Sequence, residues 1–202
     1  MPPTARSPRQ DRSIATRERI LRATLACLNK RGYAGTTTTA VEQQARISRG
    51  ALLYHFPTRA SLVSAAVARL FEDLRADFQR GFAALAREGD RVAAALELLW
   101  ETFQDPRLAA VLELYVAGRT DRELRNQLRP VATEHQAHVI GLAHSFFPEV
   151  ATDGRFSAVL HLVLDTLQGM AVRRLSQPDD PSVDRTLALL KELAAAATAP
   201  ER

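Results

Sequence analysis

The sequence predicts an all-α protein with a small three-helix head followed by a larger helical body. Three observations lead to this fold class. Apolar residues recur at helical spacing along most of the 202 residues. Residues 36–56 have the pattern of two short helices joined by a tight turn. No segment shows the alternation of polar and apolar residues that a convincing strand would need.

The chain begins with a stretch that lacks helical periodicity. Residues 1–12 contain three prolines and four charged side chains, and we expect a flexible basic arm there. A first helix is expected over residues 13–31, because Gly32 favours a left-handed helix terminus. Cys27 is the only cysteine, so an internal disulfide is excluded and a packed core thiol is expected. The inward face of this helix is expected to consist of Ile20, Thr24, Cys27 and Leu28.

The next two helices have clear start and stop signals. We expect Thr37 to cap the second helix and Ser48 to cap the third, which Pro57 ends. Two short capped helices separated by a tight turn, with Arg49 opening the second of them, are typical of a helix-turn-helix motif that reads DNA. The residues expected to face the core are Val41, Ala45, Leu52 and Phe56.

The distribution of charge favours the same interpretation. Residues 1–60 hold eleven Lys and Arg against three acidic residues, a balance of +8, whereas the whole chain carries +4. The remainder is therefore mildly acidic. A basic head attracts polyanions, because each neutralised phosphate releases counterions. For the charge taken alone, a solvated basic surface without a nucleic-acid partner is an equal alternative.

Longer helices are expected in the rest of the chain. They are predicted at residues 59–86, 91–104, 106–118, 121–147 with an interruption or kink at Pro130, and 154–176. A last helix follows the turn at 177–181, with Asp180 as its cap and Pro181 in its first position. No run of 18 apolar residues occurs and the Arg-rich N-terminus does not look like a secretory signal, so a cytoplasmic protein is expected.

Residues 16–65 carry a set of segments that is specific when taken together. The segments are Thr16-Arg17-Glu18-Arg19-Ile20-Leu21, Gly32-Tyr33, Thr36-Thr37, Ile47-Ser48-Arg49-Gly50-Ala51-Leu52 and Tyr54-His55-Phe56-Pro57-Thr58-Arg59. This set resembles the tetracycline-repressor (TetR) family of bacterial transcription regulators. The resemblance implies a homodimer with a DNA-binding domain at residues 13–60. It implies a ligand-binding and dimerisation domain at 61–202, where a bound small molecule alters the spacing of the two heads.

The resemblance also implies a role for each matching head residue. Thr37 and Ser48 are implied as helix caps, and Thr38 as a residue that faces phosphate. The residues implied to face base edges are Thr39, Arg49, Gly50 and Ala51, and those implied to hold the DNA backbone are Tyr54, His55 and Arg59. The chemistry suits these roles, because an Arg fork can bond both acceptors of a guanine and hydroxyls suit phosphate. The alternatives are a structural cap for His55, core packing for Tyr54 and a solvated surface for Arg49.

Two positions depart from the family pattern. Arg46 stands where the family usually has Gly, and a left-handed Arg costs roughly 1 kcal/mol relative to Gly. Leu53 stands where the family usually has Tyr, and a leucine cannot donate the hydrogen bond of a tyrosine to phosphate.

Side chains on several body helices are candidates for a ligand pocket, with ordinary core packing as the alternative. They are Phe78, Phe82, Trp100, Phe103, Tyr115, His135 and His138. The two histidines stand three residues apart, a spacing that zinc could use, but a polar lining or a surface pair is the favoured interpretation. No metal and no other cofactor are predicted.

The last two helices carry apolar stripes that either a protomer core or a dimer seam would explain. Because the stripes are joined by a short turn, a dimer bundle is favoured, and the resemblance strengthens this interpretation. The expected interface residues are Phe156, Val159, Leu160, Val163, Leu164, Leu167, Leu187 and Leu190.

These observations predict a ligand-responsive regulator that binds double-stranded DNA as a homodimer. By the habit of the family, it would be a repressor that an unidentified small molecule releases from a palindromic operator. An enzyme is not expected, because the sequence has no phosphate loop, nucleophile elbow or paired-carboxylate motif. A helical protein-interaction adaptor is the alternative, although it leaves the basic head unexplained. No membrane partner is expected.

Overall fold

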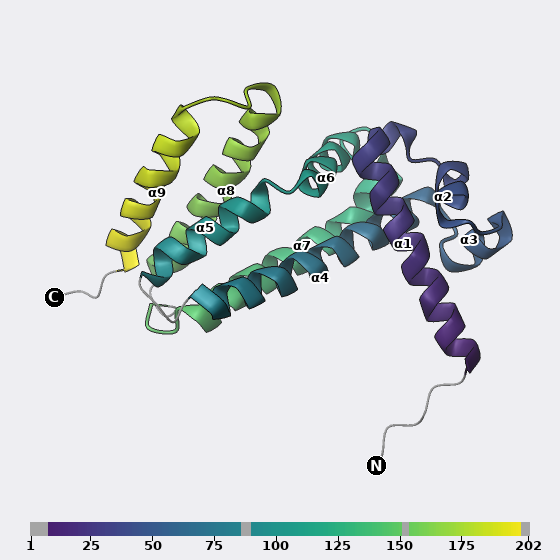
Figure 1. Ribbon diagram of the computed structural model, residues 1–202, viewed down its shortest axis with the longest axis horizontal. Helices are drawn as coiled ribbons and strands as arrows, with labels where there is room; N and C mark the ends of the chain where they lie inside the picture. Colours follow the sequence, from purple (N-terminus) through teal and green to yellow (C-terminus); the bar gives the residue numbers. More distant parts are fainter. Residues whose placement is uncertain (1–7, 86–89, 151–153, 199–202) are drawn as a thin grey trace, which may run out of the picture. The chain divides into compact units, whose positions relative to one another are not determined.

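The computed structural model describes residues 8–85, 90–150 and 154–198, which form nine helices and no strand (Figure 1). The helices are α1 (Pro8–Gly35), α2 (Thr38–Ala45), α3 (Arg49–His55), α4 (Arg59–Leu85), α5 (Arg91–Phe103), α6 (Pro106–Ala117), α7 (Arg122–Phe146), α8 (Gly154–Ser176) and α9 (Ser182–Thr198). The predicted all-α class is confirmed. The predicted helix ends within the described residues lie within a few residues of these bounds, with α1 as the exception.

The chain divides into two compact units, and neither is continuous in sequence. The first unit comprises Met1–Phe71 and Ala110–Val131, and the second comprises Glu72–Ala109 and Ala132–Arg202. The first unit therefore extends past the predicted head, residues 13–60. It also takes in the turn between α6 and α7, which lies about fifty residues further along the chain.

The core of the first unit lies among α1, α2, α3 and the start of α4. The residues expected to face inward on the first three helices are buried: Ile20, Thr24, Cys27, Leu28, Val41, Ala45, Leu52 and Phe56. The Thr24 hydroxyl donates to the carbonyl of Ile20 at 2.9 Å, so its polar atom is satisfied inside the core. Burial raises the pKa of the Cys27 thiol, as expected for a packed core residue.

α1 differs from its prediction at both ends. It begins at Pro8, so residues 8–12 are helical rather than part of a flexible arm, and residues 1–7 of that arm lie outside the described residues. Proline suits a first helical turn because its missing N–H would have no intrahelical partner there. At the other end Gly32 adopts a positive φ of 64°, which kinks α1 without ending it, and the helix continues to Gly35.

The core of the second unit is formed by α5, α8 and α9. α8 and α9 lie side by side as a hairpin and α5 packs against both (Figure 1). Asp180 caps α9, with Oδ1 accepting from the N–H of Ser182 at 2.8 Å. The buried core residues are Leu96, Trp100, Val163, Leu167, Met170, Val183, Leu187, Leu190 and Ala194. In the described part of the chain, no helix combines the length and the apolar character needed to cross a membrane.

The predicted dimer seam is largely buried inside the protomer. Four of its residues, Val163, Leu167, Leu187 and Leu190, lie in the core that α5 closes, and Val159 packs against that core. Phe156 is buried beside the rings of His144 and Phe147. Leu160 and Leu164 are half-buried. The apolar stripe was identified correctly, but most of it contacts α5 and the neighbouring helix of the hairpin instead of a second copy.

Another apolar face of the α8–α9 hairpin is exposed. Its residues are Leu162, Val172 and Leu175 on α8, and Leu189 and Leu193 on α9. Each is between 46% and 64% exposed, which is high for large aliphatic side chains that recur at helical spacing on two neighbouring helices.

Candidate nucleic-acid interface

Two side-chain caps define the helix-turn-helix. The Thr37 hydroxyl accepts from the N–H of Ala40 at 3.1 Å, and the Ser48 hydroxyl accepts from the N–H of Ala51 at 3.3 Å. Both caps satisfy a backbone donor that the first turn of a helix leaves without an intrahelical partner. The predicted capping roles are therefore confirmed, and the caps fix where α2 and α3 begin.

The residues predicted to meet DNA lie largely on accessible surface. Tyr54 is 81% exposed, which excludes the core-packing alternative for its ring. A side chain added at Gly50 would meet nothing within 4 Å, so the backbone there is open to close approach by a ligand. Thr37, Thr39, Ser48, Arg49 and Gly50 are exposed, whereas Thr38, Ala51 and His55 are half-buried.

The turn between α2 and α3 holds Arg46 in a left-handed conformation. Its φ and ψ are 52° and 54°, and it is the only non-glycine residue with positive φ among the described residues. Its N–H bonds the carbonyl of Gln43 at 3.3 Å, and the following N–H of Ile47 reaches the carbonyl of Glu42 at 3.1 Å. These bonds close the end of α2, so the strain at Arg46 belongs to the helix terminus.

Arg59, which the family resemblance assigns to the DNA backbone, makes several contacts inside the head. Its Nε donates to the carbonyl of Thr36 at 2.8 Å, and one of its terminal nitrogens donates to the carbonyl of Tyr33. Its guanidinium also lies 3.9 Å from the centre of the Tyr33 ring. These contacts tie the start of α4 to the α1–α2 connection, so Arg59 has a structural part in the head.

Tyr33 connects this part of the head to the α6–α7 turn of the same unit. Its hydroxyl donates to Asp121 at 3.0 Å, and its N–H donates to Glu113 at 2.8 Å. Burial and the bond to Asp121 raise the pKa of Tyr33. A Cβ at the preceding Gly32 would lie 2.8 Å from the Glu113 carboxylate oxygens, so glycine permits this close approach.

Arg17, a basic residue that the predicted site does not include, lies near the end of α3. The Arg17 guanidinium on α1 is 5.4 Å from the centre of the Phe56 ring. Burial, and then the positive charge of Arg17, lower the pKa of His55 below its ordinary value. Arg17 lies in the opening segment of the family resemblance, and that segment is the signal that could have identified it.

The predicted pocket residues do not form one group. Phe78 and Phe82 stack at 6.2 Å, and Phe146 lies 4.1 Å from Phe82, in an aromatic cluster between α4 and α7. Trp100 and Phe103 instead belong to the α5–α8–α9 core. Tyr115 belongs to the first unit. The pocket lined by all these residues stays a prediction, and the cluster around Phe82 includes Phe146, which sequence reasoning missed.

His135 and His138 also differ from each other. His135 is half-buried, with Nδ1 3.4 Å from Nη1 of Arg75 on α4, whereas His138 is exposed. Burial, Arg75 and His138 together lower the pKa of His135 to about 4. In the parts of the chain that the structure describes, no group of three or more His, Cys, Asp or Glu residues could hold a metal ion.

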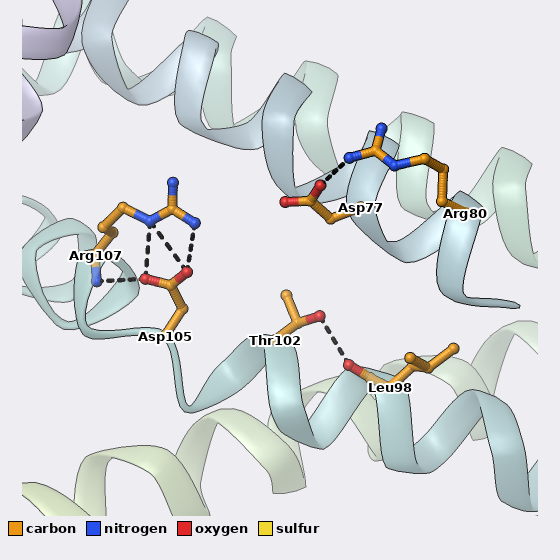
Figure 2. Close-up of polar contacts among 6 residues, drawn as sticks. All are labelled: Asp77, Arg80, Leu98, Thr102, Asp105 and Arg107. Carbon is orange, nitrogen blue, oxygen red and sulfur yellow. Dashed lines mark hydrogen bonds and ion pairs between the residues drawn. The ribbon is translucent and has the colours of Figure 1, made fainter.

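A second polar group lies at the junction of α5 and α6. Arg107 donates from Nε and from its terminal nitrogen to both carboxylate oxygens of Asp105, at 2.5–3.0 Å (Figure 2). Burial raises the pKa of Asp105, but the bonds from Arg107 outweigh this effect and lower the pKa overall. The charges of Asp73 and Asp77 on α4 also act on Arg107, and Asp77 is paired with Arg80 (Figure 2).

Comparison with known proteins agrees with this geometry. Residues 20–66 match the family described as bacterial regulatory proteins, tetR family. The HTH-type transcriptional regulator CymR of Pseudomonas putida is 28% identical over 181 residues, which cover 87% of each chain. The HTH-type transcriptional repressor AcnR of Corynebacterium diphtheriae is 29% identical over 182 residues, which cover 87% of this chain and 90% of AcnR. Residues 20–66 therefore form a TetR-type DNA-binding region, and the rest of the chain is similar to that of HTH-type transcriptional regulators.

Solved structures extend the similarity to most of the chain. The multidrug binding protein EbrR in complex with ethidium matches with a TM-score of 0.66 at 26% identity, over 88% of this chain and 97% of EbrR. EbrR in complex with proflavin matches with a TM-score of 0.58, also at 26% identity, over 88% of this chain and 99% of that one. The relatives that match most of this chain are transcriptional regulators and not enzymes.

Proposed function

We propose that this protein is a ligand-responsive repressor that binds a palindromic DNA operator as a homodimer. The observation that carries the proposal is the surface of α2 and α3, where two capped helices present Arg49 and Tyr54 on a strongly basic part of the chain. A repressor is favoured over an activator because the AcnR relatives are named as repressors. We place this activity in the cytoplasm, where bacterial operators lie.

One group of residues would contact the bases and another would contact the phosphates. Arg49 stands at the start of α3, where a guanidinium can reach both acceptors of a guanine in the major groove. Thr39, Gly50 and Ala51 would lie along the same groove. Phosphate contacts would come from Thr38, Tyr54, His55 and Arg59, with Arg17 as an additional cation. Thr37 and Ser48 position the helices through their caps.

The exposed face of the α8–α9 hairpin would form the dimer seam. Two copies paired through Leu162, Val172, Leu189 and Leu193 would remove from water the large aliphatic side chains that each protomer exposes. This face replaces the stripe centred on Leu164 and Leu167. A two-fold axis through the seam would place two heads on related half-sites, which is why a palindrome is expected.

A flat aromatic molecule is the effector class that we propose. The α4–α7 aromatic cluster supports this class, because Phe78 and Phe146 are only half-buried and would offer ring faces for stacking. EbrR, a structural relative, is described in complex with ethidium and with proflavin. The effector would release DNA only if it binds more tightly to the arrangement of heads that does not bind the operator.

Mapping the bound protein across the genome tests this function. A regulator should occupy a small number of promoters that share an inverted repeat, and deleting its gene should raise transcription from them. A helical adaptor that binds other proteins would give no shared DNA sequence. If transcription from the occupied promoters instead falls when the gene of this protein is deleted, the protein binds DNA but acts as an activator.

A further inference from the structure

Arg75 has an unusual partner for a half-buried guanidinium. Among the described residues, its polar contact is the imidazole of His135, with 3.4 Å between Nη1 and Nδ1. A guanidinium can only donate hydrogen bonds, so Nδ1 must accept and carry no proton. A neutral imidazole cannot compensate the charge of Arg75, and no carboxylate pairs with Arg75 in the part of the chain that the structure describes.

Two acidic residues on α4, Asp73 and Asp77, interact with cations other than Arg75. Asp77 pairs with Arg80, and the charges of Asp73 and Asp77 act on Arg107 at the α5–α6 junction (Figure 2). Asp105 is held by Arg107 as well. Asp77 and Asp105 are therefore paired with Arg80 and Arg107, and neither carboxylate is paired with Arg75.

Aromatic rings continue from Arg75 along the same two helices. On α4, Phe78 and Phe82 follow Arg75 at offsets of three and seven, and on α7 Phe146 follows His135 at an offset of eleven, so each set shares one helix face. The two faces meet, since Phe146 lies 6.1 Å from Phe78 and 4.1 Å from Phe82. The surface between α4 and α7, called here the α4–α7 seam, thus has a cationic end at Arg75 and an aromatic end at Phe78, Phe82 and Phe146.

We propose that this seam is the effector site and that Arg75 selects an aromatic carboxylate. The guanidinium would hold the carboxylate as a bidentate partner beside His135, and the aromatic ring would lie against Phe78 and Phe146. Such a ligand supplies a carboxylate partner for Arg75 and fits the distance of about one helical turn between Arg75 and Phe78. The inference rests on the proposed function and specifies the charge of its effector.

Binding of matched probes by calorimetry tests the inference. The probes are 2-naphthoate, its uncharged counterpart 2-naphthamide, and the cation ethidium. The wild-type protein should bind the carboxylate at least tenfold more tightly than the amide. Arg75→Gln should abolish this preference, whereas Arg80→Gln, which removes the same charge from an exposed position on α4, should keep it. Circular dichroism melts would verify that each variant is folded.

Several results would overturn the inference. These are equal affinity for carboxylate and amide, binding of ethidium alone, no binding of any probe, or an equal loss of preference in both Arg variants. If Arg75→Gln does not fold, Arg75→Lys, which keeps the charge without the fork, should bind the carboxylate more weakly than wild type does. Binding to duplex DNA, measured without any probe, reports on the proposed function separately.

Discussion

Arg46 shows that backbone strain in the head can lie at a residue that the proposed DNA contacts do not include. Arg46 adopts a conformation that costs a non-glycine residue roughly 1 kcal/mol, and its side chain is exposed. Arg46→Gly should therefore raise the free energy of unfolding by up to about 1 kcal/mol, since glycine adopts positive φ readily. Denaturant unfolding of the two proteins measures this difference.

The same variant should bind DNA with unchanged affinity and unchanged salt dependence. A uniform loss of affinity on specific and random DNA, with a salt slope smaller by about one unit, would instead assign a phosphate contact to Arg46. A less stable variant would contradict the account of the turn.

Two arginines of the head should respond differently to truncation. Arg49→Ala should relax the selected DNA sequence by about 1–3 kcal/mol of discrimination at one base pair, because Arg49 is exposed at the start of α3. Arg59→Ala should instead lower the free energy of unfolding by about 2 kcal/mol, because it leaves the carbonyls of Tyr33 and Thr36 without their charged donor. Selection from random DNA and thermal melts separate the effects, and an unchanged consensus for Arg49→Ala would refute its assignment.

The sequence predicted local features of the site well and distant partners poorly. The caps at Thr37 and Ser48 and the left-handed turn at Arg46 depend on neighbouring residues, so a short pattern contains them. The partners of Arg59 lie 23 and 26 residues away, and no local pattern could reveal them. The same limit applies to Phe146, whose importance depends on its contact with Phe82.

At the scale of elements, sequence periodicity identified which helix faces are apolar but could not tell what covers them. The stripe on α8 was recognised, yet Leu167 is fully buried by α5 and α9 while Leu162 is 57% exposed. Both a protomer core and a dimer seam need leucine, so only the three-dimensional arrangement distinguishes them. The start of α1 was missed because proline is as compatible with a first helical turn as with a loop.

The hydrogen bond from Tyr33 on α1 to Asp121 in the α6–α7 turn can be tested directly. Tyr33→Phe removes the hydrogen bond to Asp121 and keeps the ring beneath Arg59, so it should lower the free energy of unfolding by about 1 kcal/mol. Tyr115→Phe is a matched control in the same unit, because no hydrogen bond of the Tyr115 hydroxyl is seen among the described residues. Equal effects of the two substitutions would mean that the bond to Asp121 adds nothing.

At the scale of the whole molecule, the proposed dimer depends on the exposed face of α8 and α9. Leu189→Glu places a charge on a side chain that is 54% exposed in the protomer, so the protomer should fold while the dimer dissociates. Leu167→Glu places the same charge in the core and should unfold the chain. Sedimentation velocity distinguishes the two results, and a Leu189→Glu dimer of undiminished stability would move the seam elsewhere.

The central claim is that the exposed face of α2 and α3 reads DNA in a two-fold complex. Fluorescence anisotropy with a duplex selected from a random pool, titrated at several salt concentrations, tests it most directly. The account predicts two protomers per inverted repeat and a binding constant that falls with salt at a logarithmic slope of about −4 or steeper, because several phosphates are contacted. A selected pool without an inverted repeat, or binding to it that ignores salt, would contradict the account.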